Sequence, residues 1–543
     1  MEVDLSVEAI RLKNFMAFED SGWIELRPIT LLFGRNSSGK SAIIRALRLL
    51  RQSLDIPSGR GALRFSSPQG IDLGPYWETV HRLPGQDKPQ DGESPPRMAF
   101  GFRCALPTVL DELWSLLGQY LDNSGEQAPA REYLPKLVEV ELVFESTRND
   151  EQARLSEVNI SCVIASNGAT YTYNVFSALR LGGDDAYAFG EEWWFASDLL
   201  ISDAESDEGL WSGWGIDTEK SFLPRLVPIV RQVVDRRQPQ HGFVDRLLGD
   251  IKGQVADFLL RLVHLGPIRP EPSRAYAYGP MDIEALENAD WRGFVRLLQG
   301  DVDQDAAQRI DAWLVATELA QKLEVKSFGS TENVGVLAQL SLQDLSGLIV
   351  NLADVGYGIS QVIPVLVECA TAKPGDLVIV EQPELHLHSS AQSKLGDLFI
   401  EAALRNLLVD WRNKAQSALE ASESLPHTPI AYNALPTPAP RFLLETHSEH
   451  LLLRLRRRAA ETFNFQNNGQ NLQSEEQDVP EWPLATDDLR VYFIFKEDGL
   501  YSKVVQIGIE HYGELDLSKA PPEFDDFFAD DLIELAALAR ALP

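Results

Sequence analysis

The 543-residue sequence contains only three cysteines, Cys104, Cys162 and Cys369, and none of them belongs to a C-x-x-C pair. So few and so widely separated cysteines support neither a disulfide framework nor a zinc site. A reducing cytoplasm is therefore the expected location of the protein.

Long apolar runs and a basic N-terminus are also missing. No apolar stretch approaches the roughly 18 residues that span a bilayer. The acidic residues Glu2 and Asp4 stand where a signal peptide would be basic. We therefore expect a soluble protein that is not exported and has no membrane partner.

Positive charge is scarce as well. Lys and Arg total 49 against 81 Asp and Glu, which gives a formal net charge of −32. This charge opposes long-range attraction to nucleic acid, so nucleic-acid binding is possible but not favoured, and it would need a local basic patch. The arginines at 454 and 456–458 form one candidate patch; a helix with a basic end that complements its dipole explains them as well.

What the sequence does contain is a phosphate-binding loop. Residues 34–41 read G-R-N-S-S-G-K-S, a complete match to G-x-x-x-x-G-K-[ST], between a strand-like run and a run with apolar residues at helical spacing. In such a loop Lys40 reaches the β- and γ-phosphates and the Ser41 hydroxyl ligates Mg²⁺. The chain is therefore predicted to bind a nucleoside triphosphate with Mg²⁺. The residues expected around the phosphates are Gly34, Arg35, Asn36, Ser37, Ser38, Gly39, Lys40, Ser41 and Ala42.

Glu381 is the candidate for a second Mg²⁺ ligand because it ends an apolar strand-like run at 377–380. An acidic residue at the carboxyl end of a parallel strand can hold the water shell of the metal beside the phosphates. Gln382 follows, in the position that usually holds a water-activating glutamate. A carboxamide can orient a water molecule but is a poor base.

Glu384 is the nearest alternative carboxylate, and His386 or His388 could accept or relay a proton. In the alternative interpretation, Glu384 caps a turn and the two histidines are packing residues. The sequence leaves both interpretations open.

Two further motifs follow the pattern of an anion site. Residues 354–361 read D-V-G-Y-G-I-S-Q before an apolar helix-like run, and small residues before a helix can form an anion-binding N-terminus. Residues 446–450 read T-H-S-E-H directly after a strand-like run at 441–445, which places His447 where it can contact a γ-phosphate or its attacking water. Each motif alone is weak; their order along the chain is informative.

That order resembles the ABC-type ATPase heads of the SMC, Rad50 and RecF class. In detail it is most similar to the bacterial AAA/ABC-like ATPases of the overcoming-lysogenization-defect group and their defence-system relatives. The segments that carry the resemblance are 12–15 (L-K-N-F), 33–41, 72–74 (D-L-G), 265–269 (L-G-P-I-R), 354–361, 381–388 and 445–448.

The resemblance implies ATP and Mg²⁺ as cofactors and a head-to-head homodimer or higher homo-oligomer. Gly356, Gly358 and Ser360 would close over the ATP of the other subunit, Glu381 would be the Mg²⁺-side acid, and His447 the switch histidine. Two departures stand out. Gly356 occupies the place of the usual signature serine, with Ser360 as the suggested replacement, and Gln382 predicts slow hydrolysis.

The fold class expected is α/β: an ABC-type P-loop ATPase head, with a mixed sheet and an antiparallel β subdomain, that carries a largely helical insertion. We divide the chain into 1–107 (first half of the head), 108–263 (inserted β/helical subdomain), 264–463 (second half of the head) and 464–543 (hairpin and acidic tail). Antiparallel strands are predicted at 98–106, 137–146, 155–165 and 170–176, parallel strands at 376–380 and 441–445, helices at 108–121, 223–234 and 244–263, and loops at 417–440 and 464–483.

The motifs predict an ATPase that is too slow to be a motor. The resemblance implies that its assembly controls a partner effector in bacterial antiphage defence. Relatives in the lysogenization-defect group often carry a Toprim nuclease, and the sequence lacks its early glutamate and later Asp-x-Asp, so a nuclease or toxin partner is expected. The alternative is a RecF-like or SMC-like DNA-maintenance ATPase that binds duplex DNA.

Overall fold

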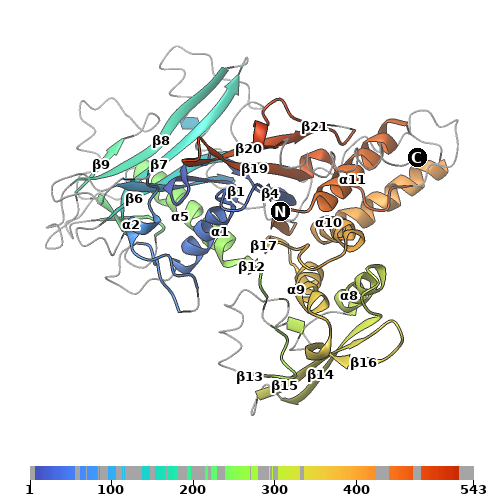
Figure 1. Cartoon of the computed structure of the whole chain (residues 1–543). Helices are drawn as coiled ribbons and strands as arrows, with labels where there is room; N and C mark the ends of the chain where they lie inside the picture. Colours follow the sequence, from blue (N-terminus) through green and yellow to red (C-terminus); the bar gives the residue numbers. More distant parts are fainter. Residues whose placement is uncertain are drawn as a thin grey trace. The chain divides into compact units, whose positions relative to one another are not determined.

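The computed structural model describes residues 7–54, 62–68, 70–83, 85, 96–105, 113, 115–116, 137–146, 153–166, 169–181, 192–196, 214–217, 222–228, 239–269, 271–278, 293, 296–297, 304–330, 335–421, 439–468, 479–510 and 512–524. The chain forms two compact units, each assembled from separate segments (Figure 1). Unit 1 comprises Met1–Glu25, Ser41–Leu260 and Lys496–Lys503, and unit 2 comprises Leu26–Lys40, Arg261–Phe495 and Val504–Pro543. The four consecutive segments expected from the sequence stay a prediction.

Unit 1 is built on an antiparallel sheet of order β2-β1-β5-β6-β7-β8-β9, with β3 paired to β1. The strands are β1 (Val7–Phe15), β2 (Phe18–Asp20), β3 (Ile24–Glu25), β5 (Arg97–Ala105), β6 (Leu137–Ser146), β7 (Ala153–Ser166), β8 (Ala169–Leu181) and β9 (Glu192–Ala196). β10 (Trp214–Asp217) and β11 (Arg225–Pro228) form a separate antiparallel pair. The antiparallel strands predicted between 98 and 176 are therefore confirmed.

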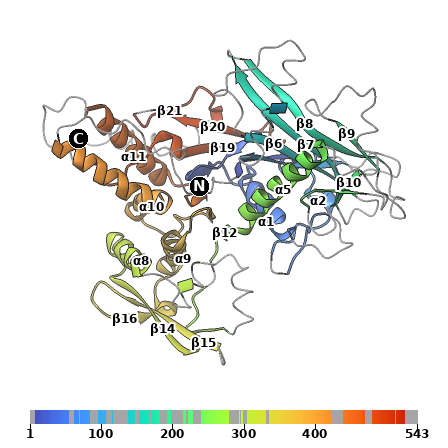
Figure 2. The same ribbon diagram turned by 180° about the vertical axis from the view of Figure 1, so that it is seen from behind.

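Three helices of unit 1 are described: α1 (Lys40–Gln52), the short α2 (Tyr76–Thr79) and α5 (Pro239–Leu260). α5 packs against β1 and β5. Figure 2 shows this helix from behind, in green. Its buried residues Val244, Leu247, Leu248, Ile251 and Val255 recur at helical spacing, which gives the helix one apolar stripe. The helix predicted at 244–263 thus exists, although it begins earlier and ends at Leu260.

The prediction of a largely helical insertion is wrong for the described residues between 108 and 263, because most of them form strands β6–β11. Residues 225–228, which were expected in a helix, form β11. Pro228 explains the difference in part, since the residue before a proline is pushed out of the α region. The helix expected at 108–121 lies almost entirely outside the described residues.

Unit 2 contains a seven-stranded sheet of order β12-β17-β18-β4-β19-β20-β21. The strands are β4 (Ile29–Phe33), β12 (Leu262–Leu265), β17 (Leu377–Glu381), β18 (Arg441–Glu445), β19 (Leu489–Glu497), β20 (Tyr501–Ile509) and β21 (Leu515–Asp516). The first five in this order run parallel to one another. The predicted buried parallel strands at 376–380 and 441–445 are therefore confirmed, and both are almost wholly apolar because helices cover the sheet.

The described helices of unit 2 are α8 (Gln304–Ala316), α9 (Tyr357–Thr371), α10 (Ser389–Ala421) and α11 (Glu449–Asn468), with 3-10 turns at Leu352–Asp354 and Thr486–Asp488. α10 packs against α9, α11, β4 and β18. α10 extends to Ala421, into the loop predicted at 417–440, because residues 416–421 (Q-S-A-L-E-A) are mostly good helix formers. α11 extends to Asn468, into the loop predicted at 464–483. Most of the remaining loop residues lie outside the described part.

A smaller sheet of unit 2 has the order β13-β15-β14, with β16 paired to β15. Its strands are β13 (Tyr276–Tyr278), β14 (Lys322–Ser330), β15 (Gly335–Gln343) and β16 (Ile349–Asn351). β16 leads through Leu352–Asp354 into α9. The last strand of this sheet therefore directly precedes the glycine-containing motif at 354–361.

The α/β class, with a mixed sheet and a separate antiparallel sheet, is confirmed. The parallel strands also determine where the predicted nucleotide-binding residues lie. The carboxyl ends of β4, β18 and β17 lie side by side, and they lead into Gly34, Thr446 and Gln382. No helix in the described ranges combines the length and the apolar character needed to cross a membrane.

Candidate nucleotide-binding site

The phosphate loop joins the buried strand β4 to α1, as the sequence predicts. Gly34 has a φ of 146°, and a Cβ built there would lie 2.2 Å from the Ile494 carbonyl oxygen. Gly39 has a φ of 110°. Both φ angles lie in a region that residues with a Cβ rarely adopt, and position 34 also has no space for a Cβ. The conformation of the loop therefore requires glycine at both positions. Arg35, Asn36 and Ser37 form its exposed tip.

Lys40 is the buried cation of this loop, only 4% exposed. Its Nζ donates hydrogen bonds to the carbonyl oxygens of Gly34 (2.7 Å) and Arg35 (3.0 Å), and it lies 3.8 Å from Oε1 of Glu445. Burial lowers the pKa of Lys40, and the Glu445 carboxylate opposes this shift. The carbonyl oxygens of the loop thus surround the Lys40 ammonium group, which lies beside Glu445 at the end of β18.

The loop has the features that a triphosphate requires. Gly34 leaves no room for a side chain, and the buried hydroxyl of Ser38 has no hydrogen-bond partner in the described part of the chain. A buried hydroxyl without a partner is costly and is suited to a ligand oxygen. Ser41 and Ala42 follow in the first turn of α1, the end of a helix that attracts anions.

Glu381, the predicted Mg²⁺-side acid, ends β17 directly opposite Glu445 of β18. Its Oε1 lies 2.7 Å from Nε2 of His264, which is in β12. No role in the site was predicted for either neighbour. Glu445 could have been found, because it ends an apolar run in the same way as Glu381; His264 could not, because only the pairing of β12 with β17 brings it here.

Glu384 connects two loops of the site. Its Oε2 accepts a hydrogen bond from the Thr446 hydroxyl (2.8 Å), and its Oε1 accepts one from the His447 backbone N–H (2.7 Å). Burial raises the pKa of Glu384, and these hydrogen bonds oppose the shift. The carboxylate therefore fixes the loop after β18. Its predicted catalytic role stays a prediction.

His447 lies in the same cluster. Burial, with a smaller contribution from the charge of Lys40, lowers the pKa of its imidazole to about 4. The imidazole is therefore neutral at physiological pH and can contact a phosphate without adding charge. This position fits the predicted switch histidine, whose role stays a prediction.

Gln382 adopts a left-handed conformation, with a φ of 46°. Its backbone N–H donates to the Glu445 carbonyl oxygen (2.7 Å), and the carbonyl oxygen of Glu381 accepts a bond from Nη2 of Arg269 (2.9 Å). The peptide bond that joins Glu381 to Gln382 is therefore held at both its nitrogen and its oxygen. Arg269 is a further site neighbour whose contact the sequence did not indicate.

The glycine motif forms the start of α9. Gly356 is the exposed N-cap residue, and Tyr357 is 43% exposed. The first N–H groups of a helix have no partner within the helix, so this end can bind an anion. Gly358 lies where a Cβ would be 2.9 Å from the carbonyl oxygen of His386.

Ser360 has a different environment from the two glycines. It is 4% exposed, and its hydroxyl donates to the Tyr357 carbonyl oxygen (2.8 Å) within the first turn of α9. Contact with the phosphate of a second subunit would require this side chain to leave that bond. Gly356 and Gly358 are placed at the helix start, and Ser360 is placed one turn inside.

The two histidines after Glu384 are exposed. The ring of His386 lies edge-on against Tyr357, with 4.9 Å between the ring centroids. Its backbone is left-handed, with a φ of 65°. The structure thus favours a packing role for His386, which joins the loop after β17 to the start of α9.

Among the described residues, no group of three or more His, Cys, Asp and Glu side chains is arranged to hold a metal ion. Mg²⁺ bound with a nucleotide takes most of its ligands from phosphates and water, so it needs only one or two protein ligands. Ser41 and Glu381 therefore stay the predicted ligands.

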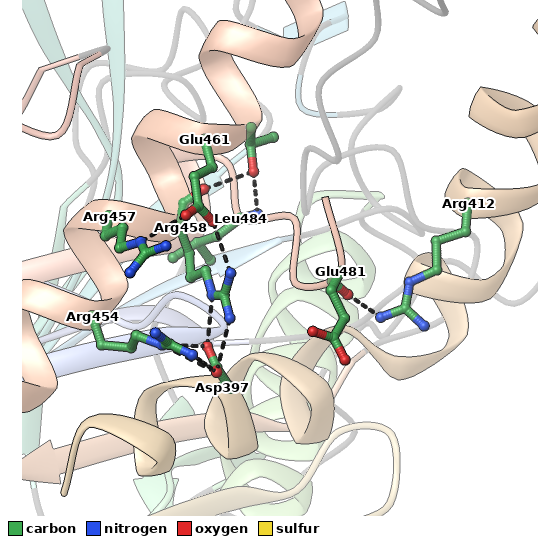
Figure 3. Close-up of polar contacts among 9 residues, drawn as sticks. Asp397, Arg412, Arg454, Arg457, Arg458, Glu461, Glu481 and Leu484 are labelled. Carbon is green, nitrogen blue, oxygen red and sulfur yellow. Dashed lines mark hydrogen bonds and ion pairs between the residues drawn. The ribbon is translucent and has the colours of Figure 1, made fainter. Parts of the chain in front are cut away.

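The arginines of α11 are paired with acidic side chains or a carbonyl group. Figure 3 shows Arg454 and Arg458 both directed at Asp397 of α10, and Nε of Arg458 lies 2.8 Å from Oδ1 of Asp397. Arg457 and Arg458 also bond Glu461, while Arg456 donates to the Gly513 carbonyl oxygen. The predicted basic patch is therefore largely neutralised, and the arginines connect α10 with α11 more than they complement a helix dipole.

Two family models match parts of this chain. Residues 292–453 match a model described as "AAA domain, putative AbiEii toxin, Type IV TA system", and residues 9–51 match one described as "AAA domain". The chain is similar to AAA-domain proteins. The two matches include the phosphate loop, the glycine motif, β17 and His447. No curated protein matches the chain.

Solved structures of SMC heads cover most of the chain at low similarity. An SMC head bound to the C-winged helix domain of ScpA has a TM-score of 0.35 and 10% identity over 93% of this chain and 98% of that one. The SMC head domain from Thermotoga maritima has a TM-score of 0.33 and 10% identity over 93% and 99%. These values are too low to carry weight, and the fold assignment rests on the strand order and the phosphate loop.

Proposed function

We propose that this chain is an ABC-type ATPase that binds ATP with Mg²⁺ at the loop 34–42, hydrolyses it slowly and assembles through its nucleotide sites into a homodimer or higher homo-oligomer. The observation that carries the proposal is the place of Lys40, buried at the end of β4 with Glu445 and His447 beside it. Phosphate oxygens would replace the loop carbonyls as the partners of its ammonium group.

The other residues take roles that follow from their positions. Ser41 and Glu381 would hold Mg²⁺, which neutralises developing charge on the phosphates when it is bound. His264 would orient the Glu381 carboxylate, and neutral His447 would donate or accept a hydrogen bond at the terminal phosphate. Gln382 would orient a water molecule without removing its proton, which makes hydrolysis slow.

Assembly would use the exposed start of α9. Gly356 and Gly358 lie at a helix N-terminus, which suits the phosphates of a second subunit. Ser360 would join them only after its hydroxyl leaves the Tyr357 carbonyl oxygen. This cost, together with Gln382, favours a slowly cycling clamp in which bound ATP holds the heads together.

ATP binding and turnover test the proposal directly. Wild-type protein should bind a fluorescent ATP analogue with Mg²⁺ and release phosphate slowly. Lys40→Ala should lose binding, and Glu381→Gln should bind but lose turnover. Lys322→Ala, which removes an exposed lysine paired with Glu324, is the matched control. Absence of Mg²⁺-dependent ATP binding by the wild type would contradict the proposal.

We further propose that the assembled ATPase controls an effector, a nuclease or toxin, in antiphage defence. The description of the family model matched at 292–453, which names a toxin of a toxin–antitoxin system, supports this direction. The test is to co-express the proteins encoded beside this chain and to measure their retention and activity with ATP, without ATP and with Lys40→Ala. Retention that does not depend on nucleotide would separate a scaffold from an ATP-controlled partner.

The alternative is a DNA-maintenance ATPase of the RecF or SMC type. The net charge of −32 and the pairing of Arg454, Arg457 and Arg458 with Asp397 and Glu461 oppose it. DNA binding that weakens steeply with salt, measured with and without ATP, would favour this alternative.

A further inference from the structure

Arg269 is among the largest fully buried side chains of the protein. It follows β12 in the segment Leu265-Gly266-Pro267-Ile268-Arg269. Within the described part, Nη2 bonds the Glu381 carbonyl oxygen, whereas the buried Nε and Nη1 have no hydrogen-bond partner. A buried guanidinium with unused donors stabilises a fold poorly, because each buried donor without a partner has lost its hydrogen bonds to water. This state favours a functional role for Arg269 over a stabilising one.

The backbone of Arg269 is fixed to α9 by a reciprocal pair of hydrogen bonds. Its N–H donates to Oε1 of Gln361 (3.0 Å), and Nε2 of Gln361 donates to its carbonyl oxygen (3.0 Å). Gln361 is 0% exposed and lies in the first turns of α9, just after the glycine motif. The position of Arg269 and the position of the helix start are therefore coupled.

A second contact supports the same coupling at the surface. Arg274, five residues further on, donates from both terminal nitrogens to the carboxylate of Asp354, with 2.9 Å for Nη1. Its carbonyl oxygen accepts a bond from Nδ2 of Asn351 (3.1 Å). Arg274 thus contacts the chain that leads into α9 at two points, Asp354 and Asn351.

On its other side, Arg269 holds the strained end of β17. The Glu381 carbonyl oxygen that it bonds belongs to the same peptide whose N–H, that of Gln382, donates to Glu445. A left-handed non-glycine residue persists only where its surroundings fix it. Arg269 supplies one of the two hydrogen bonds that fix this peptide.

We propose that Arg269 is a positioning residue of the nucleotide site, which fixes the Glu381–Gln382 peptide and couples it through Gln361 to the helix start that serves the second subunit. This inference rests on the proposed ATPase function. It predicts that ATP binding, which depends on the loop after β4, persists without the guanidinium. Hydrolysis and ATP-dependent assembly should then fail together.

The test compares Arg269→Met and Arg269→Lys with the wild type. Arg269→Met should bind ATP with wild-type affinity, lose about 100-fold in kcat because the reacting groups are misplaced, and assemble poorly with ATP. Arg269→Lys should recover part of kcat, since an ammonium can still donate to the Glu381 carbonyl oxygen. Gln361→Leu should lower kcat as well, and the double variant Arg269→Met with Gln361→Leu should lose less than the two single losses combined.

Arg405→Met is the matched control. Nη2 of Arg405 donates to the Cys369 carbonyl oxygen (3.0 Å), the same kind of bond at the opposite end of α9. It should lower thermal stability without a selective loss of kcat. If Arg269→Met keeps the wild-type kcat and assembly, or loses ATP affinity and stability in the same way as Arg405→Met, the inference is overturned. If the wild type itself does not bind ATP, it is the proposed function that fails.

Discussion

Nε2 of His264 lies 2.7 Å from Oε1 of Glu381, so the acid at the end of β17 has a partner on the neighbouring strand β12. Such a partner limits the orientations of the carboxylate, as a hydrogen-bonded neighbour does for many metal ligands. The nearby Glu445 faces Lys40 instead. Two carboxylates that stand opposite each other in the sheet thus have different partners.

The first prediction concerns the shape of the phosphate loop. Gly34→Ala should abolish ATP binding and destabilise the protein by about 1–3 kcal/mol, because its backbone is strained for any other residue and its Cβ would lie 2.2 Å from the Ile494 carbonyl oxygen. Binding of an ATP analogue and chemical denaturation measure the two effects.

Gly249→Ala in α5 is its control. A Cβ at this position would meet nothing within 4 Å. Alanine in a helix interior is favoured over glycine by about 0.5–1 kcal/mol, so this variant should be slightly more stable and bind ATP normally. Equal behaviour of the two variants would mean that the loop does not need glycine at position 34.

The second prediction concerns turnover. Gln382→Glu should raise phosphate release by a factor of about 100 or more, the range of general-base catalysis, because the carboxylate would take the place of a carboxamide on the same backbone. Gln382→Leu should release phosphate no faster than the wild type. An unchanged rate in Gln382→Glu would show that the slow step lies elsewhere, for example in opening of the assembly.

The third prediction concerns the link between α10 and α11. Asp397→Ala should lower the free energy of unfolding by about 3–5 kcal/mol, because it removes the buried carboxylate shared by Arg454 and Arg458 and leaves Arg458 only its bond to Glu461 among the described residues. The Asp397 side chain is 5% exposed, whereas that of Asp20, which forms a similar pair with Arg11, is 40% exposed.

Asp20→Ala should therefore cost about 1 kcal/mol or less. Urea denaturation of both variants, with the wild type alongside, gives the comparison. A loss at Asp397 no larger than that at Asp20 would contradict the assignment of Asp397 to a buried network.

The fourth prediction concerns pH. The pKa of His447 falls from an ordinary 6.5 to about 4 in the folded protein, so between these values the unfolded chain binds the proton and the folded chain does not. The contribution of His447 to stability is therefore constant above about pH 6.5 and is lost as the pH falls to about 4. The slope should stay below about 1.4 kcal/mol per pH unit.

Denaturation curves of the wild type and of His447→Gln across this pH range test the assignment. As the pH is lowered, the free energy of unfolding of the wild type should fall more than that of His447→Gln, because only the wild type carries the buried imidazole. Parallel curves would place the imidazole in a more hydrated environment than the structure gives it.

The parts of the site that the sequence predicts are those encoded locally. Gly34–Ser41 follow a strand and open a helix, and Glu381 ends an apolar run, so neighbours in the chain suffice to identify them. His264 and Arg269 reach the site only through the parallel pairing of β12 with β17, which has no local signature. The direction of Ser360 and the two partners of Glu384 depend on side-chain packing in the same way.

The fold shows the same division. Residues 377–380 and 442–444 are apolar throughout, and this composition alone indicates buried strands. In contrast, residues 225–228 satisfy a helical apolar spacing, and only their pairing with 214–217 selects a strand. Local pattern thus failed where a partner elsewhere in the chain determines the conformation.

The contact between Tyr357 and His386 joins, within one chain, the helix start proposed to serve a neighbouring protomer and the loop that follows that chain's own acid. In the proposed assembly, a change at His386 would therefore alter two nucleotide sites at once, that of its own chain and that of the neighbouring protomer. Mixed assemblies, in which a single member carries the change, should lose rate at both sites and not at one alone.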